Sequence, residues 1–495
     1  MSGPEPQDRP NIVVVCTDQW RGDALSVAGH PIVKTPTLDR FANRGVRFTN
    51  AYSATPTCVP ARMALMSGLS QHAHGRLGYQ DGIPFDADPT LPSALRDAGY
   101  QTQAIGKMHY SPERVRIGFD DVTLHDGYLH AARGKERGVE WYDDYLVWLR
   151  DQAGEPAVSD YFDDGVNCNS VTARPWDRPE RLHPTNWAVT ESIRWLYRRD
   201  PTRPFFLYLS FHRPHPPYNP PRWAFEQYLD PSLPDHEPPV GDWAEYFEAH
   251  RDDHDDQANV AQYDTQTRNR ARAGYYGNIT HIDHQMNRFL ESLQEFGVAD
   301  NTYVLFTSDH GEMLGDHHLW RKGYPYEGSA RVPMLLTGPD IPAGQVLDDV
   351  VELRDVMPTL LTAAGVDVPE QVEGVPLQHA FAAGADPDGG ARVREALHGE
   401  HVLLGESIQW IRSGDHLYVW FSGTGREQLF DVAADRDQVR DLAAAPEAQG
   451  RLAELRALLV EALSGRDCVA GGQLVAGLDP VLVLDPADRA RGRLT

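Results

Sequence analysis

The sequence has few cysteines and no long apolar run, and these shortages exclude several classes of protein. Its 495 residues include 4 cysteines, Cys16, Cys58, Cys168 and Cys468, which are too scattered for a disulfide framework or a Cys-x-x-Cys zinc site. No stretch approaches the roughly 20 apolar residues of a membrane-spanning helix. The N-terminal MSGPEPQDRP lacks the basic and then apolar order of a secretory signal. We therefore expect a cytoplasmic protein without a membrane partner.

Positive charge is also scarce. The chain has 46 Lys and Arg residues against 72 Asp and Glu residues, a formal net charge of −26. Such a chain cannot neutralise phosphates in bulk, which argues against nucleic acid or an anionic membrane as a partner. A small anionic substrate is still allowed, because a few local Arg and Lys residues suffice to hold it.

Apolar and amphipathic runs alternate along residues 1–392, which is the pattern of an α/β domain with a mostly parallel sheet. Helices are expected at residues 91–99, 187–199, 275–297 and 353–365. In residues 393–495 the pattern changes to short strands over 403–433 and a helix over 452–465, which predicts a smaller α+β subdomain. Its apolar stretch 480–486 is expected to dock on the body, or on a second copy in a homo-oligomer.

Four apolar runs end abruptly in polar residues. These are NIVVV (11–15) before Asp18 and Gln19, QTQAI (101–105) before Lys107 and His109, PFFLYLSF (204–211) before His215, and TYVLFTS (302–308) before Asp309 and His310. Ligands of open α/β sheets bind at the carboxyl ends of the strands, so we expect these side chains on one rim. Their carboxylates and imidazole suit a divalent cation. Either Asp alone could instead cap a turn.

Two long stretches, residues 128–186 and 219–262, interrupt the alternation of apolar and amphipathic runs. The first is rich in Tyr, Trp, Asp and Arg without a clear period, and the second is acidic and rich in proline. Long loops in a compact domain are usually lids or binding loops, so we expect substrate selection there.

Cys58 opens the string CVPARMALMSG (58–68), ahead of an apolar helical run. A cysteine-dependent phosphatase needs a longer loop between its Cys and Arg than the three residues that separate Cys58 from Arg62. A Cys/His protease would need surroundings that are absent. A buried thiol with a packing role stays open. Pro60 suits the first helical turn, whose amides would point at an anion near Cys58.

The string CVPAR (58–62) resembles the signature of the type I sulfatases of the alkaline phosphatase superfamily, in which this cysteine is oxidised to formylglycine. Three further segments resemble the family and occur in its order: GKMH (106–109), FHRPHPPY (211–218) and TSDHGEMLGDHHLWRKGYPYEGSARVP (307–333). The resemblance covers nearly the whole chain from Asn11 to about Ala443. It implies an alkaline-phosphatase-like, doubly wound fold and a sulfatase, such as an arylsulfatase, that cleaves the S–O bond of a sulfate ester.

The resemblance also implies a metal and a modification. A divalent cation, calcium first and manganese or magnesium as alternatives, would be bound by Asp18, Gln19, Cys58, Asp309 and His310. The formylglycine made from Cys58 by a maturation enzyme would, as its hydrate, attack sulfur. Asp309 would take the proton of the attacking hydroxyl.

The remaining matched residues would bind the substrate or move protons. Arg62 and Lys107 would hold the hydrate and offset negative charge. Lys322 and His215 would bind the sulfate and protonate the leaving alcohol. His109 would remove the proton that lets the covalent intermediate collapse.

Gln19 and His310 depart from many sulfatases and resemble choline-type alkyl sulfatases and phosphonate monoester hydrolases. Lys107 and His109 favour sulfate esters. Two alternatives stay open: a phosphonate monoester or phosphodiester hydrolase that uses the same site, and a non-catalytic binding protein with an unconverted Cys58.

Overall fold

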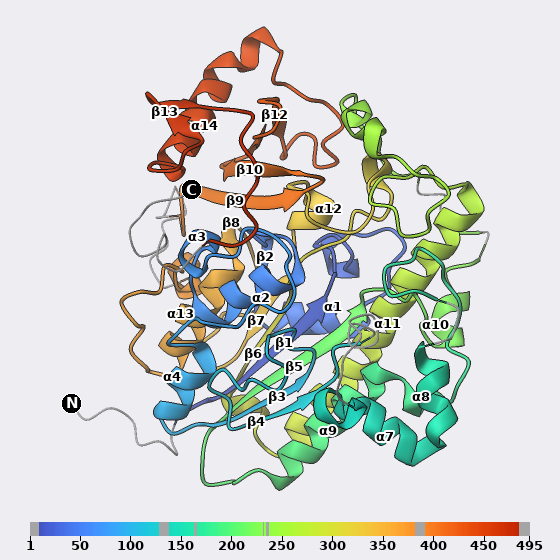
Figure 1. The fold of residues 1–495 in the computed structure, drawn as a ribbon. Coiled ribbons are helices and arrows are strands. Elements are labelled where there is room, and N and C mark those ends of the chain that lie inside the picture. The colour runs from blue at the N-terminus through green and yellow to red at the C-terminus, as the bar shows by residue number, and fades with distance from the viewer. Residues whose placement is uncertain are drawn as a thin grey trace.

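An eight-stranded sheet forms the centre of the large domain (Figure 1). The computed structural model describes residues 9–127, 138–162, 166–230, 232–233, 237–381 and 392–484. The sheet order is β4-β3-β5-β1-β6-β7-β2-β8. Its strands are β1 (Asn11–Asp18), β2 (Val46–Tyr52), β3 (Gln101–Gly106), β4 (Asp121–Leu124), β5 (Phe205–Pro214), β6 (Thr302–Ser308), β7 (Met334–Thr337) and β8 (Gln345–Glu352). All neighbours are parallel except β7, which is antiparallel to β6 and β2. The predicted α/β class is confirmed.

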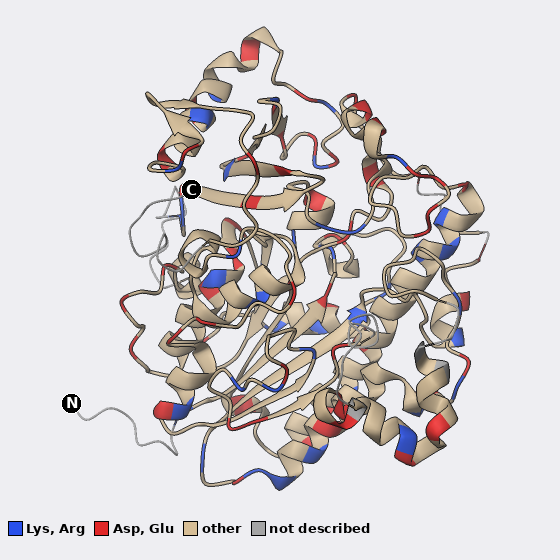
Figure 2. Ribbon diagram, in the orientation of Figure 1, with Lys and Arg blue, Asp and Glu red and all other residues tan. Residues whose placement is uncertain are grey.

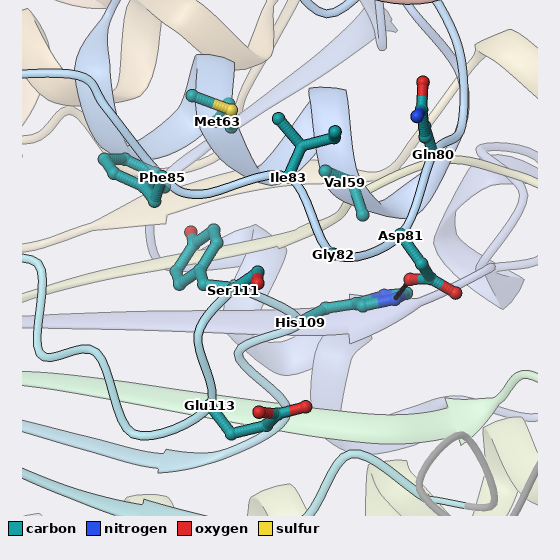
Figure 3. Close-up of a pocket in the computed structure, with 11 residues that line it drawn as sticks. Val59, Met63, Gln80, Asp81, Gly82, Ile83, Phe85, His109, Ser111 and Glu113 are labelled. Atoms are coloured by element: carbon teal, nitrogen blue, oxygen red, sulfur yellow. Dashed lines mark ion pairs between the residues drawn. The ribbon is translucent and has the colours of Figure 1, made fainter. Parts of the chain in front are cut away.

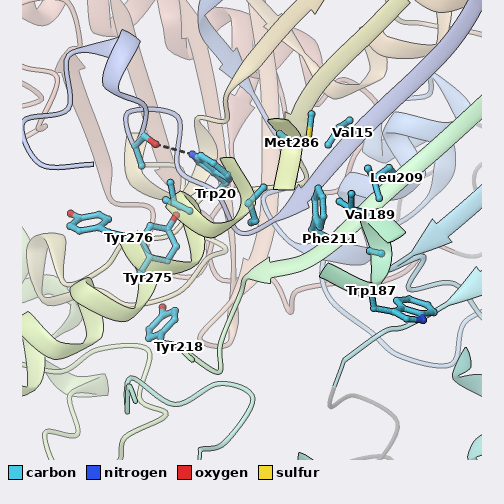
Figure 4. Packing of buried hydrophobic residues seen from close by; sticks show 14 of the residues in the cluster. Val15, Trp20, Trp187, Val189, Leu209, Phe211, Tyr218, Tyr275, Tyr276 and Met286 are labelled. Carbon is cyan, nitrogen blue, oxygen red and sulfur yellow. Dashed lines mark hydrogen bonds between the residues drawn. The ribbon is translucent and has the colours of Figure 1, made fainter. Parts of the chain in front are cut away.

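Helices cover both faces of the sheet because β1 is apolar on both sides. Val13 and Val15 pack with α1 (Pro36–Asn43), α9 (Pro184–Arg198) and α11 (Thr265–Glu295). Figure 4 shows part of this layer, with Met286 of α11 near Val15. Ile12 and Val14 face the other layer, α2 (Cys58–Ser67), α4 (Leu91–Asp97) and α13 (Val356–Ala363). A strand buried on both faces reads as a continuous apolar run, which is why β1 is visible in the sequence.

The predicted helices are present, with one boundary misplaced. The helix expected at 275–297 is the 31-residue α11, which begins at Thr265 behind the cap of Asp264. Its first turns are polar and exposed, so they lack the apolar period that marks a helix in a sequence. Charged residues are carried mainly by such outer helices and loops, whereas the central strands are almost free of them (Figure 2). None of the described helices is long and apolar enough to cross a membrane.

The stretch 128–186 is more ordered than a loop where the structure describes it. It contains α6 (Val139–Tyr142), α7 (Asp144–Ala153) and α8 (Glu155–Phe162). The Asp143 carboxylate caps α7 by accepting from the amide of Leu146 at 2.8 Å. These helices are too short for a periodic signal, so sequence inspection missed them. Residues 128–137 and 163–165 lie outside the described part of the chain.

The C-terminal region forms a separate four-stranded antiparallel sheet, as predicted. Its order is β12-β11-β10-β9, with β9 (Ala396–Leu403), β10 (Glu406–Ser413), β11 (His416–Phe421) and β12 (Glu427–Asp431). Helix α14 (Gln449–Ala462) packs on it. The boundary at residues 392 and 393 stays a prediction, because residues 382–391 are outside the described ranges. The described part of the apolar segment, residues 480–484, docks on the body, where the Leu484 amide donates to the Gly75 carbonyl at 2.9 Å.

Strand β9 ties this sheet to the large domain on both sides of α2. The Glu400 amide donates to the carbonyl of Ala54 at 2.9 Å, and the Val402 amide donates to that of Leu77 at 3.0 Å. Arg466 holds the buried Glu400 carboxylate through Nη2 and Oε1 at 2.8 Å. Burial alone would raise the pKa of Glu400, but the charge and hydrogen bonds of Arg466 lower it to about 2.

We expect the substitution Arg466→Ala to reduce the free energy of unfolding by about 3 kcal/mol, because it leaves a buried carboxylate without its partner. The pair lowers the pKa of Glu400 from 4.5, so its stabilisation is present above pH 4.5 and is lost as the pH falls toward 2. Urea unfolding of both proteins at neutral and acidic pH measures this. The matched control is Arg194→Ala, which removes an exposed pair with Glu191. Equal losses in the two variants would contradict the importance of the buried pair.

Candidate active site

Asp18 and Asp309 lie side by side because their strands are parallel neighbours. Thr17 of β1 is paired with Ser308 of β6, and the Asp309 amide donates to the Thr17 carbonyl at 3.2 Å. Both carboxylates are fully buried. His310 follows Asp309, and its ring nitrogen Nε2 lies 3.4 Å from Asp18 Oδ1. The expected convergence of these strand ends is therefore present.

Cys58 is the first residue of α2, and its side chain meets this group. Its Sγ lies 3.2 Å from His310 Nε2, 3.6 Å from Asp18 Oδ1 and 3.7 Å from Lys107 Nζ. One donor atom from each of four residues lies within 4.8 Å of the others: Asp18, Cys58, Asp309 and His310. Four converging donors, all buried, are enough to hold a cation.

The protonation of the cluster suits a metal. The Nδ1–H of His310 donates to the Gly311 carbonyl at 2.9 Å, so Nε2 carries the lone pair that faces the cluster. Burial lowers the pKa of this imidazole. Burial would raise the pKa of Asp18, but the Lys107 ammonium, followed by His215 and Lys322, holds it well below its usual range. Two carboxylates and a neutral imidazole fit a hard or borderline divalent cation.

Arg62 and Lys107 supply positive charge from two other elements. Arg62, one turn after Cys58 on α2, donates from Nε to Asp309 Oδ2 at 2.8 Å. Its Nη1 donates to Tyr208 and Ser210 of β5 at 3.0 and 2.9 Å, while its buried Nη2 has no partner among the described residues. The Lys107 ammonium donates to Asp18 Oδ2. The Nη2 amino group of Arg62 is therefore an unused hydrogen-bond donor beside the cluster.

Gly106 lets Lys107 reach this position. Its φ is +100°, and a Cβ there would overlap the carbonyl oxygen of Ser210 on β5. Only glycine adopts this conformation at so close an approach without strain. The chain can therefore turn at the end of β3 and direct Lys107 toward Asp18.

Gln19 links Lys322 to the buried Glu312. Lys322 Nζ donates to Gln19 Oε1 at 2.6 Å, and Gln19 Nε2 donates to Glu312. Glu312 also accepts from the hydroxyl of Tyr218 and from the amides of Leu314 and Arg321. Its fixed carboxylate orients the Gln19 amide. Gln19 therefore lies at the rim as predicted, with its oxygen bonded to Lys322.

His109 comes two residues after Lys107 and lines a cavity of about 240 Å³, together with Val59 and Met63 of α2. Its Nε2 is 3.5 Å from Asp81 Oδ1 and 3.4 Å from the hydroxyl of Tyr79. Figure 3 shows the ring pointing at Asp81, with Val59 of α2 across the cavity. The Asp126 carboxylate accepts from the His109 amide at 3.2 Å and fixes this turn.

His215 approaches Asp18 from β5. Its amide donates to the Asp18 carbonyl at 3.0 Å, and its Nδ1–H donates to the Pro216 carbonyl at 2.8 Å. Its Nε2 therefore carries a lone pair. Burial and then the charge of Lys322 hold the pKa of His215 well below its usual range. All ten predicted residues thus lie at one end of the sheet, and the other three cysteines lie outside the cluster.

The sulfatase family model matches residues 10–366, more than half of the chain. The chain belongs to the sulfatase family. An arylsulfatase of Clostridium perfringens is 45% identical over 467 residues, which cover 93% of this chain and 95% of that protein. A choline-sulfatase of Rhizobium meliloti is 29% identical, over 88% of this chain and 83% of that protein. The predicted family and enzyme class, a sulfuric ester hydrolase, are confirmed.

A solved structure supports the same fold. The phosphonate monoester hydrolase of Agrobacterium radiobacter superimposes on this sulfatase with a TM-score of 0.73 at 27% identity, over 90% of this chain and 94% of that chain. The expected doubly wound fold is confirmed. The roles of single residues are not tested by these similarities and stay predictions.

Sequence reasoning missed the residues of this sulfatase that hold others in place. Tyr208 and Ser210 position Arg62, Glu312 positions Gln19, and Asp81 contacts His109. Glu312 lies in the segment SDHGE and carried a detectable signal, a carboxylate three residues after Asp309. Tyr208 and Ser210 carried none, because alternate residues of an apolar strand look alike until their neighbours are known.

Proposed function

We propose that this sulfatase hydrolyses sulfate esters through a formylglycine at position 58. The observation that carries the proposal is the position of the Cys58 side chain among Asp18, His310 and Lys107, with Sγ in contact with all three. In the mature enzyme an oxygen of the formylglycine hydrate would take the place of Sγ. A maturation enzyme that oxidises Cys58 is the implied partner.

In the first half-reaction, a hydroxyl of the hydrate attacks sulfur. The new O–S bond forms as the bond from sulfur to the alcohol oxygen breaks. Asp309 takes the hydroxyl proton; its Oδ2 accepts one hydrogen bond, from Arg62, and keeps a lone pair for it. Lys322 binds the sulfate and returns a proton to the alcohol oxygen. His215 joins it in both roles once the negative charge of the bound sulfate favours the protonated imidazole. The second Arg62 amine, Nη2, is the donor available to the hydrate.

In the second half-reaction, the covalent sulfate hemiacetal collapses. His109 removes the proton of the remaining hydroxyl, the C=O bond of the aldehyde forms and the C–O bond to sulfate breaks. Asp81, 3.5 Å from His109 Nε2, stabilises the imidazolium that results. Water then regenerates the hydrate. A serine at position 58 has no second hydroxyl, so it could not release sulfate in this way.

The proposed cation is calcium, bound by Asp18, Asp309, His310 and residue 58, with Gln19 as a further ligand. When bound, it supplies positive charge that favours the ionised hydroxyl and the sulfate. Calcium prefers oxygen ligands, and the carboxylates provide them. The imidazole of His310 is the ligand that supports manganese as the alternative, with magnesium behind it.

The state of residue 58 is tested by mass spectrometry of its proteolytic peptide from protein made in the native host. We expect the mass of an aldehyde instead of a thiol. We also expect Cys58→Ala to abolish turnover while leaving thermal unfolding within about 1 °C of the parent, because it removes the nucleophile and little volume. Cys16→Ala is the control, since burial raises the pKa of that thiol to about 12 and keeps it unreactive. Unchanged hydrolysis by Cys58→Ala would refute the covalent mechanism.

Metal removal tests the cation. We expect a chelator to abolish activity and calcium to restore more of it than manganese or magnesium. Since a ligand that binds only the folded state stabilises it, calcium should also raise the melting temperature of the stripped protein. His310→Ala should remove this rise. Equal restoration by magnesium would contradict the calcium assignment, and no thermal shift with any metal would contradict the site.

The alternative is a phosphonate monoester or phosphodiester hydrolase that uses the same groups. The similarity to the Agrobacterium radiobacter structure favours it, as do Gln19 and His310. We expect kcat/KM for an aryl sulfate to exceed that for the matched aryl phosphonate by at least about tenfold, because Lys107 and His109 favour sulfate esters. Parallel assays on one preparation measure this ratio, and a higher value for the phosphonate would reverse the assignment. The cytoplasmic location and a homo-oligomer stay predictions.

A further inference from the structure

A buried histidine of the C-terminal sheet has no hydrogen-bond partner. His401 of β9 is 4% exposed, and neither of its ring nitrogens is bonded to any described residue. Leaving a buried polar atom unpaired is costly, and nearly all such atoms in proteins have a partner. His398, three residues earlier on β9, is partly buried and donates from Nε2 to Gln409 Oε1 at 2.9 Å. Among the buried histidines of the described residues, His401 alone has both ring nitrogens without a partner.

The ring of His401 lies against the segment that carries Lys322. A Cβ at Gly323 would be 3.0 Å from two of its ring atoms, and Gly323 has a φ of +97°. Glycine at this position lets the ring approach the backbone beside Lys322. The hydrogen bonds of Glu400 to Ala54 and of Val402 to Leu77 hold β9 rigidly on either side of this ring.

His401 is a neutral group near charged ones. Burial, followed by the nearby His310, lowers its pKa to about 3, with an opposite effect of Glu400 and a smaller lowering effect of Lys322. A neutral imidazole has one donor and one acceptor nitrogen, which matches the two functions of a hydroxyl group. In the proposed mechanism Lys107 and Arg62 offset the negative charge of the transferring group, and Lys322 binds the sulfate. The neutral imidazole of His401, which can donate one hydrogen bond and accept another beside the Lys322 segment, suits the uncharged alcohol part of the ester.

We propose that His401 binds the alcohol part of the substrate through a hydroxyl next to the sulfated oxygen, so that this sulfatase prefers sulfate esters of polyols, sugars or catechols over simple aryl sulfates. The inference rests on the proposed function, because it takes Lys322 as the residue at the leaving-group side. It assigns the C-terminal sheet a part of the substrate site.

A matched pair of aryl sulfates tests the proposal. 4-Nitrocatechol sulfate carries a hydroxyl next to the ester, and 4-nitrophenyl sulfate lacks it. We expect His401→Phe, which keeps a ring of similar shape, to lower kcat/KM for the catechol sulfate about tenfold more than for the phenyl sulfate. The extra loss should appear mainly in KM, since the hydrogen bond is present before and during bond cleavage. His401→Gln, which keeps a donor and an acceptor, should preserve most of the selectivity.

His398→Phe is the matched control from the same strand. It removes a partly buried histidine that has a partner, so we expect lower stability and an unchanged ratio between the two substrates. If His401→Phe folds and its kcat/KM falls by the same factor on both sulfates, the ratio between the substrates is unchanged and the proposal is overturned. His401 would then be a buried residue that binds water. Failure of the parent enzyme to hydrolyse either sulfate would instead overturn the proposed function, which separates the two failures.

Discussion

The active site depends on the parallel pairing of β1 with β6, which forces two carboxylates into the same buried volume. Asp18 and Asp309 end adjacent strands in matched register, so neither can move away from the other. Such charges are tolerated only when they are paired. Lys107 and Arg62 meet this need from the end of β3 and the second turn of α2. With both cations in place, donor atoms of Asp18, Cys58, Asp309 and His310 still lie within 4.8 Å of one another, which is an arrangement that suits a bound cation.

Buried hydrogen bonds to backbone carbonyls decide what the histidines can do. His310 and His215 each donate Nδ1–H to the carbonyl of a neighbour in sequence, Gly311 and Pro216. Both rings therefore present an unprotonated Nε2 to the carboxylate cluster. In the proposed mechanism the same arrangement serves a metal ligand, His310, in one case and a substrate contact, His215, in the other. His401 differs because no carbonyl or side chain occupies either nitrogen, and it is thus the ring with both functions left for a ligand.

The C-terminal sheet is joined to the large domain next to the nucleophile helix α2. Strand β9 bonds to the chain before and after α2, the helix that begins with Cys58. The Arg466–Glu400 pair fixes the same strand from its other side. A region that looks like a separate subdomain in the sequence is therefore bonded to both flanks of the helix that begins with Cys58.

The sequence by itself determined the chemical groups of the site and the apolar strands that end in them. Continuous apolar runs ending in Asp18, Lys107, His215 and Asp309 are readable without a structure, because strands buried on both faces need apolar residues throughout and ligands gather at their ends. Residue 58 was marked by the resemblance of CVPAR to the sulfatase signature. Short helices such as α7 and the early turns of α11 were not readable, since they lack a long apolar period.

Only the tertiary structure decided which side chains hold the others. Tyr208 and Ser210 reach Arg62 because β5 lies beside β1 and β3, and Glu312 reaches Gln19 across the loops of two strands. His401 comes 79 residues after Lys322 and meets its segment through packing of a second sheet. Contacts of this kind depend on register and on the docking of separate layers. Strand register and the docking of layers leave no local pattern in the sequence. The sequence therefore could not predict these contacts of Tyr208, Ser210, Glu312 and His401.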